Sequence, residues 1–139
     1  MYATREHRLL IFRHTHYPEA GTQVPAGTIE SGEDPETAAI RELAEESGLV
    51  VERADLLGRF EFDLLPYRDE IQERYVFHVV VSETTPERWF HHETHASESK
   101  EPIEFEFYWR DMDGTDLGLA GGQGGLLPQL FERMRVGRK

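Results

Sequence analysis

The segment that most constrains the fold runs from Gly27 to Leu49, because it contains both signals for the ends of a helix and a cluster of carboxylates. Asp34 suits the N-cap of a helix, and Pro35 suits its first position. Gly48 stands where a helix commonly ends in the left-handed conformation. Good helix formers with an apolar stripe lie between these signals: Ala38, Ala39, Ile40, Leu43 and Ala44. The segment therefore predicts an amphipathic helix between Asp34 and Gly48.

Three carboxylates converge on one side of this helix. Glu42 and Glu46 are four residues apart, so their side chains lie about 40° apart around the axis, and Glu45 borders the same face. Like charges at this spacing cost an isolated helix roughly 0.2–0.5 kcal/mol per pair, and Arg41 offsets only part of that cost. Mg²⁺ or Mn²⁺ would turn the repulsion into binding, because these ions take oxygen ligands. On spacing alone, the alternative is a solvated acidic face, which is the commoner fate of a run of acids.

The rest of the chain indicates strands and a second helix. Strand patterns occupy residues 2–4, 8–13, 22–24, 59–65, 74–82, 89–95 and 103–109, and a terminal helix is expected over 126–135. The glycine-rich stretch 118–125 lacks the Lys-Ser/Thr ending of a phosphate-binding loop, so we expect a flexible connection there. This order of elements indicates a mixed α/β sandwich, and 139 residues fit a single domain, 1–139.

Composition excludes several classes of function. The chain has no cysteine, which rules out disulfides, thiolate zinc sites and cysteine nucleophiles. No apolar run approaches the roughly 18 residues of a membrane span, and the first residues lead into no signal-type apolar region, so we expect a cytoplasmic protein without membrane contact. The net charge of −12 argues against general nucleic-acid binding, and an anionic substrate would require cations to mediate its contact.

Nine residues of the acidic segment stand at fixed spacing: Gly27, Glu33, Arg41, Glu42, Leu43, Glu45, Glu46, Gly48 and Leu49. They resemble the Nudix box, G-x5-E-x7-R-E-U-x-E-E-x-G-U with U aliphatic, at every fixed position. A small departure is Pro25-Ala26 before Gly27, where the family frequently has Pro-Gly. The resemblance extends more loosely over the whole chain and implies a Nudix-type α/β/α sandwich. It also implies an enzyme, a hydrolase that cleaves the pyrophosphate in a nucleoside diphosphate linked to another moiety.

The resemblance implies roles for the box residues. Gly27 would offer its backbone carbonyl to a metal ion, Glu42 and Glu46 would be the principal metal ligands, and Glu45 would hold a further ion or its water. Arg41 would pair with Glu33 and orient the metal ligands. Glu33 would then support these ligands without binding the metal ion itself. The implied cofactor is Mg²⁺ or Mn²⁺, and the implied partner is a small nucleotide-type substrate. Family members are often dimers, so the resemblance also allows a homodimer.

The general base and the substrate contacts stay open at this level. The family places its base variably, so the candidates are Glu45, Glu93, Glu98 and Glu101. We expect Glu104 and Glu106 to form the solvent-facing side of a strand. Among the arginines, Arg59 and Arg74 are the better candidates for holding the substrate, because both fall on predicted strands. Three histidines resemble a transition-metal cluster, but we interpret them as surface residues: His91, His92 and His95. Five aromatics could stack on a base, but we interpret them mainly as core: Phe60, Phe62, Tyr67, Tyr75 and Phe77.

Two other functions fit part of the pattern. A Nudix-fold module that binds a nucleotide without hydrolysing it would have the same fold, but such modules often lose box glutamates, and all three are present here. A purely structural acidic domain leaves the spacing of glycine, arginine and glutamate unexplained. The sequence therefore favours the hydrolase.

Overall fold

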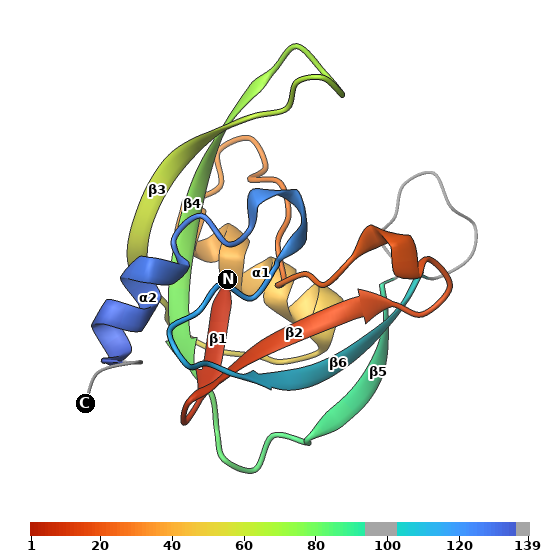
Figure 1. Ribbon diagram of the computed structural model, residues 1–139, viewed down its shortest axis with the longest axis vertical. Helices are drawn as coiled ribbons and strands as arrows, with labels where there is room; N and C mark the ends of the chain where they lie inside the picture. Colours follow the sequence, from red (N-terminus) through yellow and green to blue (C-terminus); the bar gives the residue numbers. More distant parts are fainter. Residues whose placement is uncertain (94–102, 136–139) are drawn as a thin grey trace.

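The computed structural model describes residues 1–93 and 103–135. Six strands form one mixed sheet in the order β3-β4-β1-β2-β6-β5 (Figure 1). Neighbouring strands are antiparallel except β1 and β4, which are parallel. The strands are β1 Tyr2–Arg5, β2 Arg8–His14, β3 Asp55–Asp63, β4 Ile71–Val80, β5 Arg88–Glu93 and β6 Ile103–Asp111.

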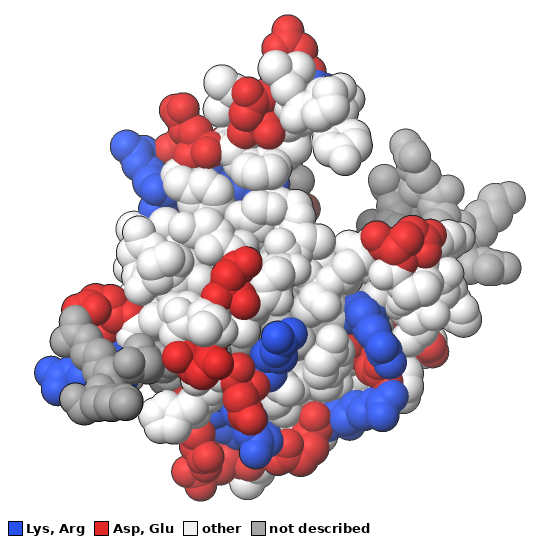
Figure 2. All heavy atoms as spheres, viewed as in Figure 1, with Lys and Arg blue, Asp and Glu red and all other residues white. Residues whose placement is uncertain are grey.

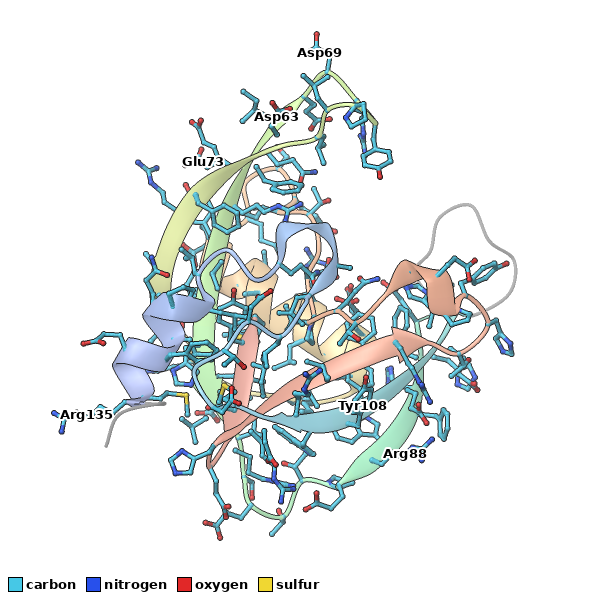
Figure 3. The ribbon with its side chains drawn as sticks, in the orientation of Figure 1. Asp63, Asp69, Glu73, Arg88, Tyr108 and Arg135 are labelled. Atoms are coloured by element: carbon cyan, nitrogen blue, oxygen red, sulfur yellow. The ribbon has the colours of Figure 1, made fainter. Side chains whose placement is uncertain are left out.

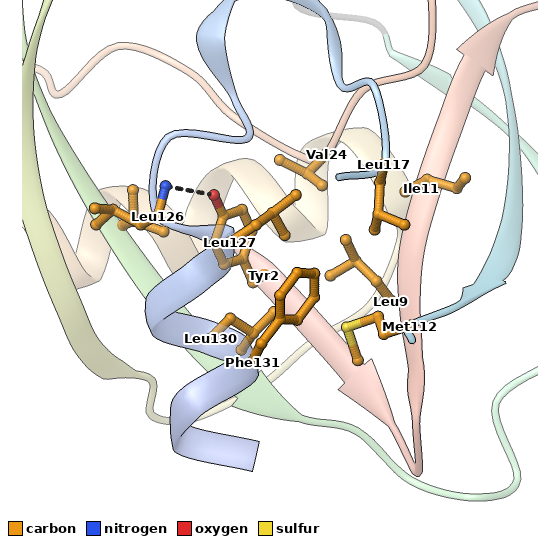
Figure 4. Packing of buried hydrophobic residues seen from close by; sticks show 11 residues of the cluster. Tyr2, Leu9, Ile11, Val24, Met112, Leu117, Leu126, Leu127, Leu130 and Phe131 are labelled. Atoms are coloured by element: carbon orange, nitrogen blue, oxygen red, sulfur yellow. Dashed lines mark hydrogen bonds between the residues drawn. The ribbon is translucent and has the colours of Figure 1, made fainter. Parts of the chain in front are cut away.

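Each face of the sheet carries a hydrophobic core under one helix. Helix α1, Pro35–Ser47, covers the face that holds Leu10, Phe12 and Phe107. Helix α2, Leu127–Met134, covers the other face, where Tyr2, Leu9 and Ile11 pack against it (Figure 4). Alternate residues of β2 thus enter opposite cores, as the two-residue period of a strand requires. The fold is the expected α/β/α sandwich, and no helix within the described residues is long and apolar enough to cross a membrane.

Strand boundaries differ from the sequence prediction mainly in the hairpin of β3 and β4. β3 begins at Asp55 rather than 59, and β4 begins at Ile71 rather than 74. The pairing of β3 with β4 continues through polar residues to Asp63 and Ile71. Backbone hydrogen bonds sustain it in this part of the hairpin, and they do not require a buried apolar face. The predicted strand at 22–24 is only an isolated bridge between Phe12 and Gln23.

The glycine-rich stretch 118–125 packs against β3, whereas the sequence pattern predicts a flexible connection there. A Cβ on Gly122 would lie 2.2 Å from the ring of Phe62, and one on Gly125 would lie 2.7 Å from the ring of Phe60. Glycine therefore lets this stretch, which includes the short 3-10 helix η2 (Ala120–Gly122), lie directly on the two aromatic rings. A second short 3-10 helix, η1, spans Pro18–Ala20.

The polar face of β6 is also different from the prediction. Glu106 is only 2% exposed and not a solvent-facing residue. Its carboxylate accepts a hydrogen bond from Arg13 Nε at 2.6 Å and another from Arg88. Two guanidinium groups from the flanking strands thus cover this carboxylate, because a buried charge requires a partner.

Candidate active site

Helix α1 is fixed at both ends by the residues that predicted it. The side chain of Asp34 accepts hydrogen bonds from the backbone nitrogens of Glu36 and Thr37, at 3.1 and 3.3 Å. Gly48 ends the helix with φ of 81°, and a Cβ there would lie 3.1 Å from the ring of His91. Leu43 is fully buried in the core under the helix. This anchoring determines which face of α1 presents the box glutamates.

Arg41 ties the box loop to the helix. Its Nε and Nη2 donate to the two carboxylate oxygens of Glu33, at 2.8 and 2.9 Å. Its Nη1 donates to Glu42 at 2.7 Å and to Glu45 at 3.2 Å, and Nη2 also reaches the carbonyl oxygen of Thr28 at 3.0 Å. The hydrogen bonds from Arg41 lower the pKa of Glu33 to about 2, so this carboxylate stays ionised. The pairing implied for Arg41 and Glu33 is therefore present.

Three carboxylates meet beside α1. One oxygen each from Glu42, Glu45 and Glu93 lie within 4.8 Å of one another, and Glu93 comes from the end of β5. The carboxylate of Glu42 also lies against Gly27, where a Cβ would be 2.0 Å from its Cδ. Burial raises the pKa of Glu42. These donors are all oxygens with little room between them, which fits a hard divalent cation such as Mg²⁺ or Mn²⁺.

Glu46 is the most buried of the box glutamates, at 6% exposure. One of its oxygens accepts a hydrogen bond from the backbone nitrogen of Ala26 at 2.8 Å, which connects α1 to the loop before Gly27. Burial, together with the nearby charges of Glu93 and Glu42, raises the pKa of Glu46 to about 8. Four acids thus share this region, and a cation would compensate the charge that burial disfavours.

The other predicted site residues are separated by the fold. In the register of β3 and β4, Arg59 pairs with Tyr75 while Phe60 pairs with Arg74, so the two arginines lie on opposite faces of the sheet. Arg59 forms an exposed ion pair with Glu73 at 2.7 Å. Arg74 lies 4.1 Å from the centre of the Phe62 ring. Arg59 and Arg74 therefore cannot hold one substrate group together.

The histidines do not form a cluster either. His91 and His92 are adjacent on β5, so their side chains leave opposite faces. His92 Nε2 lies 3.1 Å from a carboxylate oxygen of Glu104. His91 is half-buried, and its Nδ1 has no hydrogen-bond partner among the described residues. His95, Glu98 and Glu101 lie outside the described residues.

A pocket of about 740 Å³ opens beside Glu42. Its walls include residues 23–29, the start of α1, β4 residues 71–76 and parts of the segment 120–123. β1 pairs with β4 only at His78, Val79 and Val80. Within the described chain, the earlier part of β4 is therefore paired on one edge only, with β3, and its unpaired edge lies at the pocket. Sequence patterns gave no sign of this pocket, because it depends on where β1 begins beside β4.

Comparison with known proteins agrees with this architecture. A model of the NUDIX domain matches residues 1–119. A solved structure, a MutT NUDIX hydrolase from Burkholderia pseudomallei, has the same fold with a TM-score of 0.67, at 24% identity over 93% of this chain and 92% of that one. The fold of the present chain, together with its acidic loop and helix, defines it as a Nudix-type α/β/α protein. The chain belongs to the NUDIX family.

Two relatives match over shorter lengths. An RNA pyrophosphohydrolase from Dinoroseobacter shibae is 48% identical over 48 residues, which is 32% of this chain and 30% of that protein. Diphosphoinositol polyphosphate phosphohydrolase 3-alpha from Mus musculus is 37% identical over 79 residues, which is 57% of this chain and 45% of that protein. The matches thus span less than half the length of these curated relatives.

Proposed function

We propose that this protein hydrolyses a pyrophosphate linkage in a nucleoside diphosphate joined to another moiety, and that it requires a divalent cation. The observation that carries this proposal is the meeting of Glu42, Glu45 and Glu93 oxygens within 4.8 Å, with Glu42 also lining the pocket. Membership of the NUDIX family supports it, as do the names of the two relatives, one a pyrophosphohydrolase and the other a phosphohydrolase.

In this proposal Glu42, Glu45, Glu46 and the carbonyl of Gly27 hold Mg²⁺ or Mn²⁺. When bound, such an ion polarises phosphoryl oxygens and lowers the pKa of its water. Arg41 positions the ligands, because its guanidinium is fixed by two hydrogen bonds to Glu33 and contacts both Glu42 and Glu45. Loss of such a support typically reduces activity about 10–100-fold.

We assign the general base to Glu93. Among the described candidates, Glu45 is engaged by Arg41 on the helix itself. Glu93 reaches the same group of oxygens from β5, so its carboxylate can accept the proton of an attacking water while the α1 residues hold the cation. A cytoplasmic location, expected from the sequence, and a homodimer, which the family resemblance allows, belong to the same proposal and are tested by fractionation and light scattering.

The experiment is a screen of nucleoside diphosphate derivatives with Mg²⁺ or Mn²⁺, with products identified by phosphorus NMR. We expect hydrolysis by the wild-type protein and by a control, Glu52→Gln, whose exposed side chain lies outside the site. The variant Glu42→Gln/Glu46→Gln should show no turnover. Binding of these compounds without any product would instead identify a nucleotide-binding module and contradict the proposal.

A further inference from the structure

The charged side chains that line the pocket are few and mostly acidic. Among the described residues they are Glu42, Glu70, Glu73 and Arg74, with no lysine or histidine. Glu42 belongs to the proposed cation site, which leaves one arginine and two carboxylates as the other charged side chains of the described lining. Within residues 1–93 and 103–135, the pocket therefore offers a single cationic side chain to a bound molecule.

Arg74 differs from the two other arginines of the same hairpin. Its hydrogen-bond partners among the described residues are neutral: Nη1 donates to the carbonyl oxygen of Gly121 at 2.5 Å, and Nη2 donates to Gln72 Oε1 at 3.1 Å. Arg59 and Arg68 instead pair with Glu73 and Glu70, and both remain largely exposed. A half-buried guanidinium that is held in place by neutral groups keeps its charge available for an anionic group of a ligand.

The hairpin that forms the outer wall of the pocket is net acidic. Residues 59–75 contain five acids and three arginines. Figure 2 shows acidic side chains at the outer end of this hairpin, where Asp63, Asp69 and Glu73 are labelled in Figure 3. Arg59 and Arg68, the ion-pair partners of Glu73 and Glu70, lie outside the pocket lining, and the three arginines against five acids leave the hairpin a net charge of −2. A ligand with many negative groups would therefore meet repulsion at the hairpin.

We propose that the pocket selects substrates by charge: Arg74 binds at most one anionic group on the moiety beyond the diphosphate, and Glu70 with Glu73 rejects polyanions. The inference rests on the proposed function. It separates this protein from its relatives, whose names state RNA and diphosphoinositol polyphosphate, both polyanions. Tight binding of a polyanion requires several cations in one place, whereas the described pocket lining has one arginine and the chain has a net charge of −12.

The test compares a nucleoside diphosphate sugar with diphosphoinositol pentakisphosphate and a 5′-triphosphorylated RNA oligonucleotide, all with Mg²⁺. We expect the wild-type protein to prefer the sugar derivative in kcat/KM by at least about 100-fold, and we expect salt to reduce this preference because exposed charges are screened. The variant Glu70→Gln/Glu73→Gln should gain about tenfold toward the polyanions. Equal or greater kcat/KM for either polyanion with the wild-type protein would overturn the proposal.

Arg74 is tested with a uridine diphosphate sugar acid, which carries one carboxylate beyond the diphosphate. Arg74→Gln should raise KM about 10–100-fold while kcat changes by less than about threefold, and Arg74→Lys should recover part of the loss. Arg133→Gln removes the same charge outside the pocket lining and should leave both constants unchanged. An unchanged KM in Arg74→Gln, or an equal rise in Arg133→Gln, would contradict the role of Arg74.

Affinities of the same ligands, measured by calorimetry, separate this inference from the proposed function. Charge selection in binding without any hydrolysis would refute the proposed activity and support the selection. Hydrolysis of the sugar and polyanionic compounds with equal efficiency would support the activity and refute the selection.

Discussion

Replacement of Glu46 by glutamine is expected to stabilise the protein in the absence of divalent cations. Glu46 is 6% exposed, and burial raises its pKa from 4.5 to about 8. The folded state therefore binds the proton more tightly than the unfolded state does. For a carboxyl group this sign means that stability is lost as the pH rises from the unfolded pKa through the folded one.

The size of the effect follows from the shift. At pH 7 the folded, metal-free protein keeps Glu46 mostly protonated, because its folded pKa is about 8, although this pH lies about 2.5 units above the unfolded pKa of 4.5. One pKa unit corresponds to 1.36 kcal/mol, so this proton uptake on folding costs about 3 kcal/mol. Glutamine keeps an oxygen that can accept the hydrogen bond from the nitrogen of Ala26, and it is neutral without taking up a proton. We therefore expect Glu46→Gln to exceed the wild-type protein in stability by about 3 kcal/mol near pH 7, and to match it near pH 4.

The assay is guanidinium unfolding of both proteins in a chelator across this pH range. Glu52→Gln, on the exposed surface, should show no such pH-dependent difference from the wild-type protein. Added Mg²⁺ should stabilise the wild-type protein more than the variant, because a cation that binds only the folded state adds stability. A stability difference that does not change with pH, or a variant less stable than wild type in chelator near pH 8, would refute the reasoning.

Three further results are expected. Glu33→Gln should lower kcat/KM about 10–100-fold through misplaced ligands, and a loss greater than that of Glu46→Gln in the same assay would reverse the assigned roles. Glu93→Gln should lower kcat by about 10²–10⁴-fold, with a much smaller loss of cation affinity, and its pH–rate profile should lose the acid limb. A kcat within about threefold of wild type would remove Glu93 as the base. Gly122→Ala should lower the free energy of unfolding by about 1–3 kcal/mol, because the new Cβ would clash with an aromatic ring and alanine disfavours the positive φ at this position. Gly32→Ala, with a similar φ of 78° and no atom within 4 Å, measures the φ effect alone, and an equal loss there would exclude the ring contact as a cause.

The helix and its carboxylates could be predicted because their signals are local. Asp34 and Gly48 fix both ends of α1, and the spacing of the glutamates alone places them on one face. These features depend on residues within a few positions of one another. The same holds for the alternating side chains of β6, of which Phe105 and Phe107 pack in the predicted core.

The remaining features depend on pairing between distant segments. Glu93 could be proposed only among several acids, because its position beside α1 results from the pairing of β5 with β6. The separation of Arg59 from Arg74 requires the register of β3 and β4, which a sequence pattern does not fix. Glu106 carries the alternation of an exposed residue, yet two arginines from neighbouring strands cover it.

The central claim is that the acidic face of α1 is a cation site and not a solvated surface. Titration with Mn²⁺, followed by the electron paramagnetic resonance signal of the free ion, tests it most directly. We predict saturable binding to the wild-type protein and to Glu52→Gln, with affinity reduced at least about 100-fold in Glu42→Gln/Glu46→Gln, because carboxylate oxygens are the preferred ligands of this ion. Equal Mn²⁺ affinity in the wild-type protein and the double variant would contradict the claim.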